Sequence, residues 1–238
     1  MVSLLYVCVR PERGAADAEH RSFRRALGVP ELARIDLIDR PLDGEADGFD
    51  GVVVGGSPFN VVAEERDAVQ RRVEADLETM AQRALDGGTP AFFTCYGIGV
   101  VTRMLGGTVG TATPESTRPT TIRITAAGAE DPVFGPSAPE LPVLTAHKEG
   151  SAEPPPGSVL LATNDDCPVQ AYRVGSRLYA TQFHPEVTPQ DFVDRMAYYR
   201  STGYFDPREY DLTAQRVLAA SVRGTDLLRR FADRVAAR

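Results

Sequence analysis

Lysine, cysteine and histidine are scarce in this sequence, and each shortage excludes a class of function. Lys148 is the only lysine among 238 residues and the formal net charge is −7, so no basic patch is available for a nucleic acid. The three cysteines, Cys8, Cys95 and Cys167, are scattered and odd in number, which argues against a disulfide framework and favours a reducing cytoplasm. Their spacing, and that of the three histidines, fits no zinc site.

Long hydrophobic runs are missing as well. No apolar run approaches the roughly 20 residues that are needed to cross a bilayer, so we expect no membrane partner. The first run, at 4–9, lacks the basic start and the small-residue cleavage site of a secretion signal, and Pro11 ends it early. The hydrophobic content of 42% is nevertheless enough for a large core in one or two domains.

The first half of the chain alternates short apolar runs with longer amphipathic stretches. This order predicts an α/β fold with an open, mainly parallel sheet between two layers of helices. Strands are predicted at 4–9, 32–39, 49–56 and 90–95, and helices at 17–28, 63–85 and 97–105.

Closely spaced strands are expected after Gly107, and helix returns from Pro189 to the end of the chain. We predict one catalytic domain over residues 1–200 and a C-terminal helical extension over 201–238 that packs on the same domain. The extension could instead dock a partner, form a homodimer or cover a cleft. The later strands are predicted at 120–125, 141–146, 158–163, 169–174 and 177–183.

Cys95 lies between a predicted buried strand, PAFFTC, and a predicted helix that begins in GIGVV. Ligands bind at the carboxyl ends of strands in open α/β sheets. The free N–H groups and the dipole of a helix N-terminus favour a thiolate there, and the next backbone N–H can donate to an oxyanion. The pattern fits a nucleophile on a sharp turn; the alternative is an inert buried thiol.

His184 and Glu186 follow a strand-like run in YATQFHPEV. In extended chain a spacing of two residues puts both side chains on one side of the backbone. A carboxylate beside an imidazole fixes its tautomer and stabilises the imidazolium, as in a catalytic triad. The alternative is a loop histidine beside a solvated glutamate.

Gly55 and Gly56 follow another predicted buried strand, in GVVVGGSP. Glycines at this point let the backbone approach a ligand closely, with N–H groups free to hold an anion. An ordinary glycine turn is the alternative for this stretch taken alone.

Together the three stretches resemble the class I, triad-type glutamine amidotransferases, the type found in GMP synthase and in anthranilate and carbamoyl-phosphate synthases. GVVVGGSP is similar to the oxyanion strand of that family, CYG to its nucleophile turn and QFHPE to its His–Glu end. TAHKEG between them is similar to a Ser-His-Gly-Asp segment, and the resemblance spans about residues 48–187. It implies the flavodoxin-like or Rossmann-like fold of that family.

The resemblance also implies roles for individual residues. Cys95 would attack the carboxamide of a glutamine side chain, His184 would move the proton to departing ammonia, and Glu186 would orient His184. Backbone N–H groups of Gly56 and Tyr96 would form the oxyanion hole. No metal and no organic cofactor is implied, and an acceptor for the ammonia would be a separate synthetase partner.

Two departures from the family pattern concern substrate recognition. Phe93 stands where the family has glycine, and Gly99 stands where it has a glutamine that contacts the substrate. Lys148 and Glu149 replace Gly-Asp after His147; they could meet the charged ends of a glutamine-like substrate, meet a partner, or form a solvated pair. The residues expected at the substrate are Gly55, Ser57, Gly99, His147 and Lys148.

Three functions remain open from the sequence. The first is a free-standing, cytoplasmic amidotransferase-type hydrolase that releases ammonia from glutamine. The second is a γ-glutamyl peptide hydrolase with the same triad, which the missing glutamine at Gly99 favours. The third is a catalytically silent, amidotransferase-like binding module, which an intact Cys95, His184 and Glu186 set disfavours.

Overall fold

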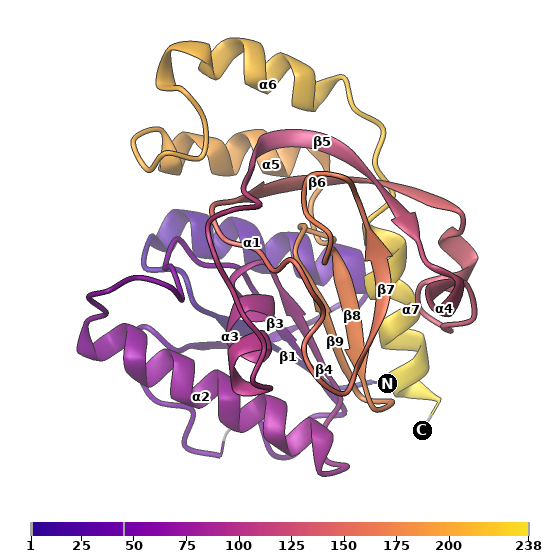
Figure 1. Ribbon diagram of the computed structural model, residues 1–238. Coiled ribbons are helices and arrows are strands. Elements are labelled where there is room, and N and C mark those ends of the chain that lie inside the picture. The colour runs from indigo at the N-terminus through magenta and orange to yellow at the C-terminus, as the bar shows by residue number, and fades with distance from the viewer. Residues whose placement is uncertain (1, 45, 238) are drawn as a thin grey trace.

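A single nine-stranded sheet forms the centre of the protein in a computed structural model that describes residues 2–44 and 46–237 (Figure 1). The strand order is β2-β1-β3-β4-β9-β8-β7-β5-β6. The first five strands in this order pair in parallel, and the remaining ones pair antiparallel. The parallel strands are β1 (Leu4–Cys8), β2 (Ala33–Asp36), β3 (Gly51–Val54), β4 (Ala91–Thr94) and β9 (Leu178–Thr181).

The antiparallel part extends the same sheet beyond β9. The closely spaced apolar runs after Gly107 supply its strands, as the sequence predicts, because short connections can join only antiparallel neighbours. These strands are β5 (Glu115–Ile124), β6 (Glu140–His147), β7 (Ser158–Thr163) and β8 (Ala171–Val174). The short helices α4 (Ala126–Ala129) and η1 (Gly135–Ser137) connect β5 to β6.

Helices cover both faces of the parallel part, and alternate residues of the buried strands point to opposite layers. Leu4 and Tyr6 pack toward the helices α1 (Arg13–Leu27) and α7 (Thr225–Ala236), whereas Leu5 and Val7 pack toward α2 (Ala68–Leu85) and α3 (Tyr96–Met104). The predicted α/β class, with an open sheet between helical layers, is therefore confirmed.

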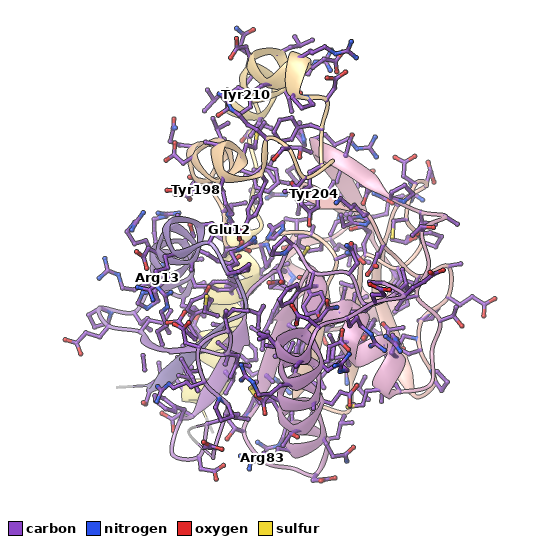
Figure 2. All side chains as sticks on the ribbon, turned by 90° about the vertical axis from the view of Figure 1, so that its left-hand side faces the viewer. Glu12, Arg13, Arg83, Tyr198, Tyr204 and Tyr210 are labelled. Carbon is purple, nitrogen blue, oxygen red and sulfur yellow. The ribbon has the colours of Figure 1, made fainter. Side chains whose placement is uncertain are left out.

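The chain after β9 crosses the edge of the sheet before it returns to the helical layer. The elements are α5 (Pro189–Met196), η2 (Ala197–Tyr199), η3 (Pro207–Glu209) and α6 (Tyr210–Leu218). Figure 1 shows α5 and α6 above the sheet, and Figure 2 places Tyr198, Tyr204 and Tyr210 at the end of the molecule opposite Arg83 of α2. Phe192, Phe205 and Val217 share a small core with Leu144 of β6.

The apolar stripe predicted near the C-terminus is the buried face of α7. Leu227, Leu228 and Phe231 are buried against residues of α1 and β4, including Phe23 and Phe92. Residues of 201–238 therefore contribute to the core of the main sheet.

Several element boundaries differ from the sequence expectation. The first helix begins at Arg13 instead of residue 17, and the long helix begins at Ala68 instead of residue 63. Asp67 explains the later start, because its side chain accepts a 2.7 Å hydrogen bond from the N–H of Gln70 and so caps the helix there. Over 2–44 and 46–237, none of the helices combines the length and the apolar character that crossing a membrane requires.

Candidate functional site

Three neighbouring strands bring the three sequence motifs to one edge of the sheet. β4 lies between β3 and β9, with Phe93 opposite Val54 on one side and Thr94 opposite Thr181 on the other. Because all three strands run in the same direction, the segments that follow them emerge together at their carboxyl ends. This is the edge at which open α/β sheets bind ligands.

Cys95 occupies a sharp turn between β4 and α3. Its φ is 51° and its ψ is −103°, a conformation that costs free energy for a residue with a side chain. The backbone N–H of Cys95 donates to the carbonyl of Thr181 at 2.8 Å, which ties the turn to the end of β9. A Cβ at Gly97 would lie 3.1 Å from Phe93, so glycine after the turn makes room for the phenylalanine before it.

His184 and Glu186 lie beside this turn and are joined to each other. The Nδ1 of His184 is 2.9 Å from Oε1 of Glu186, and both side chains are buried. The backbone N–H of His184 donates to the carbonyl of Leu144 at 3.0 Å, which fixes the segment against β6. The imidazole therefore has one nitrogen bound to Glu186, and its ring lies beside Cys95, since a Cβ at Gly56 would contact both side chains.

The charges around His184 favour its protonated form. Burial lowers the pKa of His184, but the neighbouring carboxylate of Glu186 and the Cys95 sulfur outweigh it and raise the pKa to about 9. Burial raises the pKa of Glu186, yet the positive charges of His184 and Arg195 hold it well below its usual range. An imidazolium supported by a carboxylate fits these directions.

A chain of buried ion pairs continues from Glu186 to the first helix. Arg195 of α5 donates to Glu186 at 2.9 Å and to Oε1 of Glu19 at 2.7 Å. Arg10, just after β1, donates to the same Glu19 oxygen at 2.8 Å and to the hydroxyl of Tyr199 at 2.9 Å. Alternating charge along this chain offsets part of the cost of removing each ion from water, and it joins α1 and α5 to His184.

Gly56 faces both reactive side chains. A Cβ at this position would lie 2.9 Å from Cε1 of His184 and 3.4 Å from Cβ of Cys95, so only glycine leaves the gap open. The backbone N–H of Gly56 donates to Oε1 of Glu19 at 3.3 Å. To act in an oxyanion hole, the N–H of Gly56 must exchange this long hydrogen bond to Glu19 for one to the substrate. Tyr96, the other expected donor, is the first residue of α3, where helix N–H groups lack helical partners.

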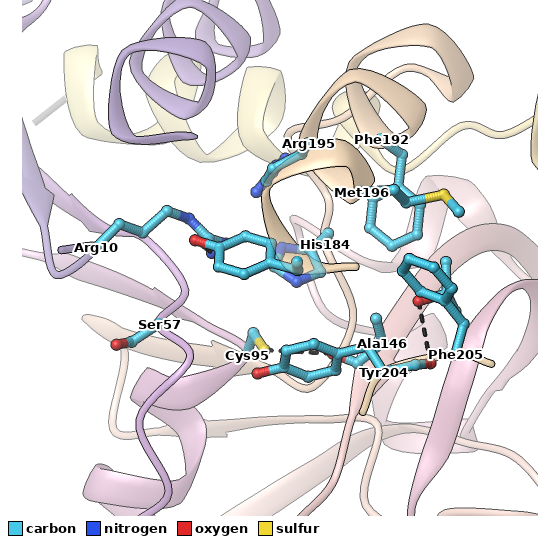
Figure 3. Close-up of a pocket in the computed structure, with 12 residues that line it drawn as sticks. Arg10, Ser57, Cys95, Ala146, His184, Phe192, Arg195, Met196, Tyr204 and Phe205 are labelled. Atoms are coloured by element: carbon cyan, nitrogen blue, oxygen red, sulfur yellow. Dashed lines mark hydrogen bonds between the residues drawn. The ribbon is translucent and has the colours of Figure 1, made fainter. Parts of the chain in front are cut away.

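Two cavities meet at Cys95. The His184 cavity has a volume of about 40 Å³, and the Lys148 cavity has a volume of about 30 Å³. Ser57, Cys95 and Tyr204 line both cavities, and Figure 3 shows them in the His184 cavity. The His184 cavity is further lined by Arg10, Thr117, Ala146, His184, Phe192, Arg195, Met196, Tyr199 and Phe205. The Lys148 cavity is further lined by Phe59, Asn60, Tyr96, Gly99, Val109, His147, Lys148, Glu149, Ser151 and Gln182.

Four of the five residues expected at the substrate line these cavities. Ser57 lines both, while Gly99, His147 and Lys148 line the Lys148 cavity. Gly55 lines neither: a Cβ there would lie 2.1 Å from a carboxylate oxygen of Glu19, so this glycine allows the strand end to approach α1.

The two charged residues after His147 make different contacts. The Nζ of Lys148 lies 4.8 Å from the centre of the Tyr204 ring, as in a cation–π contact. Glu149 accepts hydrogen bonds from the backbone N–H groups of Val61 at 2.8 Å and Val62 at 3.1 Å. Burial raises the pKa of Glu149 in spite of these donors. Both side chains line the Lys148 cavity, and Glu149 also holds the loop at Val61 and Val62.

Gly99 leaves space that Val61 fills. A Cβ at Gly99 would lie 3.2 Å from Cγ2 of Val61. The glutamine that the family pattern places here therefore has no room unless the loop around Val61 moves.

Within residues 2–44 and 46–237, two groups of side chains have the composition of a metal site. One contains Glu19, His184 and Glu186, and the other contains Glu115, His147 and Cys167. In the first group Arg10 and Arg195 already bind the carboxylates, and guanidinium groups in the site disfavour a cation. In the second group Glu115 accepts hydrogen bonds from His147, Asn164 and Gln170. Neither group offers a set of free ligand atoms.

The sequence motifs do not identify Glu19, Arg10, Arg195 or Tyr204. Glu19 lies in a charged helical segment that reads as solvent-exposed, yet its side chain is fully buried. The one signal in the sequence is indirect, since Glu19 falls on the same helical face as Phe23, four residues later. Tyr204 reaches the site from the segment between η2 and η3.

Comparison with known proteins assigns the family. The model of the glutamine amidotransferase class-I family matches residues 23–199, a range that includes Cys95, His184 and Glu186. The GMP synthase [glutamine-hydrolyzing] of Aliivibrio salmonicida is 29% identical over 140 residues, which are 58% of this chain and 24% of that protein. The GMP synthase of Streptococcus mutans is 29% identical over 146 residues, which are 60% of this chain and 26% of that protein. This chain thus spans about a quarter of the length of these curated relatives.

Solved structures share the fold over most of the chain. A glutamine amidotransferase from Thermotoga maritima superposes with a TM-score of 0.73 and 18% identity, covering 100% of this chain and 99% of that one. A protein described as a putative GMP synthase subunit from Thermoplasma acidophilum superposes with a TM-score of 0.61 and 25% identity, covering 84% of this chain and 96% of that one. With most of its length matched by the family model, this chain belongs to the class I glutamine amidotransferases.

Proposed function

We propose that this protein is an amidotransferase-type hydrolase that cleaves the side-chain amide of glutamine and releases ammonia. The observation that carries the proposal is the arrangement at the strand ends. Cys95 lies on a strained turn beside His184, and Glu186 binds the other nitrogen of that imidazole at 2.9 Å. A nucleophile, a base and a group that orients the base are the parts that acyl transfer needs.

The proposed reaction has two stages. The Cys95 sulfur attacks the amide carbon, and the proton held by His184 passes to the departing nitrogen, so that ammonia leaves and a γ-glutamyl thioester remains. Water, activated by the then neutral His184, hydrolyses the thioester to glutamate. Backbone N–H groups of Tyr96 and Gly56 stabilise the tetrahedral oxyanion, each contributing about 3 kcal/mol to transition-state binding.

We further propose that a separate synthetase uses the ammonia. The relatives that the chain matches are described as glutamine-hydrolysing GMP synthases, and the chain corresponds to about a quarter of each. A cytoplasmic location is part of the proposal, because Cys8, Cys95 and Cys167 are all free thiols and a catalytic thiol needs reducing surroundings.

A γ-glutamyl compound as the substrate is the second candidate. Gly99 and the close approach of Val61 favour it, because they remove the glutamine side chain that contacts free glutamine in the family pattern. A silent binding module is the third candidate, and the ion-paired surroundings of His184 disfavour it, since binding alone gives no reason to hold a raised pKa beside a thiol.

The test measures glutamate and ammonia released from glutamine, with γ-glutamyl dipeptides as parallel substrates and the Cys95→Ala protein as a control. We expect glutamate from at least one substrate with the unmodified protein and none above background with the variant. Equal release by both proteins, or no release from any substrate with and without a synthetase present, rejects the hydrolase assignment.

A further inference from the structure

The two cavities at Cys95 divide the substrate into two parts. His184 lines only the cavity of about 40 Å³, and Lys148 lines only the other one. If the proposed hydrolysis holds, His184 hands its proton to the departing nitrogen, so this nitrogen lies on the His184 side of Cys95. The charged end of the glutamyl group then lies on the Lys148 side, where Lys148 supplies a cation for its carboxylate.

The wall of the His184 cavity is largely apolar. Phe192 and Met196 of α5, Phe205 of the following segment and Ala146 of β6 contribute to it (Figure 3). Phe192 and Met196 are each 4% exposed, and Phe205 is 9% exposed. Ammonia has no apolar surface and gains nothing from such a wall, whereas an alkyl group gains about 0.8 kcal/mol for each buried CH₂.

The cations beside this cavity are already paired. Arg10 binds Glu19, and Arg195 binds both Glu19 and Glu186, with the three N–O distances between 2.7 and 2.9 Å. Of the described residues that line the cavity, these two arginines are the only ones with a permanent positive charge. The Nε atoms of both arginines lack a hydrogen-bond partner. A leaving group that carries a carboxylate, such as an amino acid, would nevertheless compete with Glu19 and Glu186 for the same guanidinium groups, so it is costlier to bury than an uncharged one.

The volume of the cavity favours a short group. A cavity needs about 10–15 Å³ to hold one water-sized group, so the space of about 40 Å³ suits roughly three such groups. The amide nitrogen and one or two carbon atoms fill this space, and a longer chain extends beyond the apolar wall.

We propose that the preferred substrate is a γ-glutamyl amide of a short aliphatic amine, such as γ-glutamylethylamide. The C–S bond forms between Cys95 and the γ-carbonyl carbon, the C–N bond breaks, and the proton of His184 goes to nitrogen. The free alkylamine leaves through the His184 cavity. Water then cleaves the thioester, giving glutamate and restoring the thiol, so the overall reaction is hydrolysis without a further reactant.

Three substrates test the inference against the proposed function on which it rests. Glutamate release is measured as kcat/KM for glutamine, γ-glutamylethylamide and γ-glutamylglycine, with the Cys95→Ala protein as the control. We expect the ethylamide to exceed both others by about tenfold or more, as two methylene-sized groups in an apolar pocket allow. A kcat/KM for glutamine or γ-glutamylglycine equal to or above that of the ethylamide overturns the inference and leaves the hydrolase assignment standing. No glutamate from any of the three rejects the hydrolase assignment itself.

A pair of methionine variants tests whether this cavity is the leaving-group site. Met196→Ala enlarges the cavity wall, and Met80→Ala removes an equally buried methionine that lines neither cavity. We expect the kcat/KM ratio of γ-glutamylbutylamide to γ-glutamylethylamide to rise about tenfold in Met196→Ala and to stay unchanged in Met80→Ala. An unchanged ratio in Met196→Ala, or the same change in both variants, overturns the assignment of the cavity.

Discussion

The molecule contains two buried clusters of a cysteine, a histidine and a glutamate that look alike in residue type. In one, His184 binds Glu186 at 2.9 Å next to Cys95. In the other, His147 binds Glu115 at 2.8 Å, and ligand atoms of these two lie within 4.8 Å of the Cys167 sulfur. The residue types and the His–Glu distances match, so neither distinguishes a catalytic site from a structural one.

The difference lies in which atoms remain free. Both ring nitrogens of His147 are engaged at 2.8 Å, one by Glu115 and one by the backbone carbonyl of Glu149. Among the described residues, the His184 ring has an oxygen as its hydrogen-bond partner only at Nδ1, which binds Glu186, and the ring lies beside Cys95. Burial raises the pKa of Cys167. Both sulfurs contact a backbone carbonyl, at 3.8 Å for Cys167 and 3.9 Å for Cys95, but Cys95 also lines two cavities. A triad therefore needs a histidine with one ring nitrogen free and an open cavity beside the sulfur, as well as the three residue types.

Replacing the cysteine of each cluster should give the largest difference between the two clusters. We expect Cys95→Ala to lower the kcat for γ-glutamyl hydrolysis by at least about 10⁴-fold, because the covalent route is lost. Cys167→Ala should keep kcat within about threefold and lower only the melting temperature. Comparable losses of activity in both variants at a temperature where both are folded would contradict the distinction.

The two glutamates should differ in their effect on activity. Glu186→Gln removes the charge that stabilises the His184 imidazolium, and we expect kcat to fall about a thousandfold. The buried ion pair of Glu186 with Arg195 is also broken, so a loss of stability of about 3 kcal/mol is expected as well. Glu115→Gln leaves its buried partners without a charge to bind and should reduce the free energy of unfolding by about 3 kcal/mol, with kcat nearly retained. Urea denaturation gives the free energy of unfolding of each variant, and glutamate release gives its kcat. Equal kcat values of the two folded variants would contradict the expected difference.

Arg195 is expected to act as a positioning residue for the first cluster alone. Arg195→Met removes the donor to Glu186 and Glu19, and we expect kcat to fall about 30-fold, within the range for outer-shell partners. Loss of the positive charge should also raise the pKa of His184 and move the alkaline limb of the rate profile to higher pH.

A matched Arg195→Lys variant keeps the charge and serves as the control for packing. It should restore the position of the alkaline limb and part of kcat. A loss of kcat in Arg195→Met with no movement of the limb would indicate a purely structural role.

The clusters should also titrate at opposite ends of the pH scale. The pKa of His184 is raised to about 9 from a usual value near 6.5, so the stability from its protonated form is complete below about pH 6.5 and is lost as pH rises through about 9. We expect kcat/KM for the first half-reaction to fall over the same alkaline range, about tenfold per pH unit, as the proton for the leaving nitrogen is lost.

The contribution of Glu115 to stability has the opposite pH dependence. Burial raises the pKa of Glu115. The hydrogen bond and the charge of His147, together with hydrogen bonds from the side-chain amides of Asn164 and Gln170, outweigh burial and lower it to about 2. Its stabilising contribution is therefore present above about pH 4.5 and is lost as pH falls toward 2. Melting temperatures of the Glu115→Gln and unmodified proteins should converge in acid. A constant difference between pH 7 and pH 3 would count against this assignment.

The sequence predicts the features that are marked locally. Cys95, His184 and Gly56 each follow an apolar run at a strand end, and parallel pairing of adjacent strands then brings them together. The roles of these residues stay predictions until activity is measured.

The partners of these residues are not marked in the sequence. Glu19 and Arg195 are 176 residues apart and join only when α5 packs beside α1. Both read as surface charges, because the pattern of apolar residues reports which face is buried and not which buried ion finds a partner. Glu115 carries no local signal for the same reason: its histidine lies 32 positions away, across an antiparallel strand pair.

Tyr204 gives the fold a consequence for protein engineering. Its ring lines both cavities, yet it lies beyond residue 199, where the match to the family model ends. A gene fragment that ended at residue 199 would encode the triad without the tyrosine that lines both cavities. The unit to transplant between relatives is therefore larger than the shared module, and exchanging only residues 200–206 should retune substrate choice while the triad itself stays untouched.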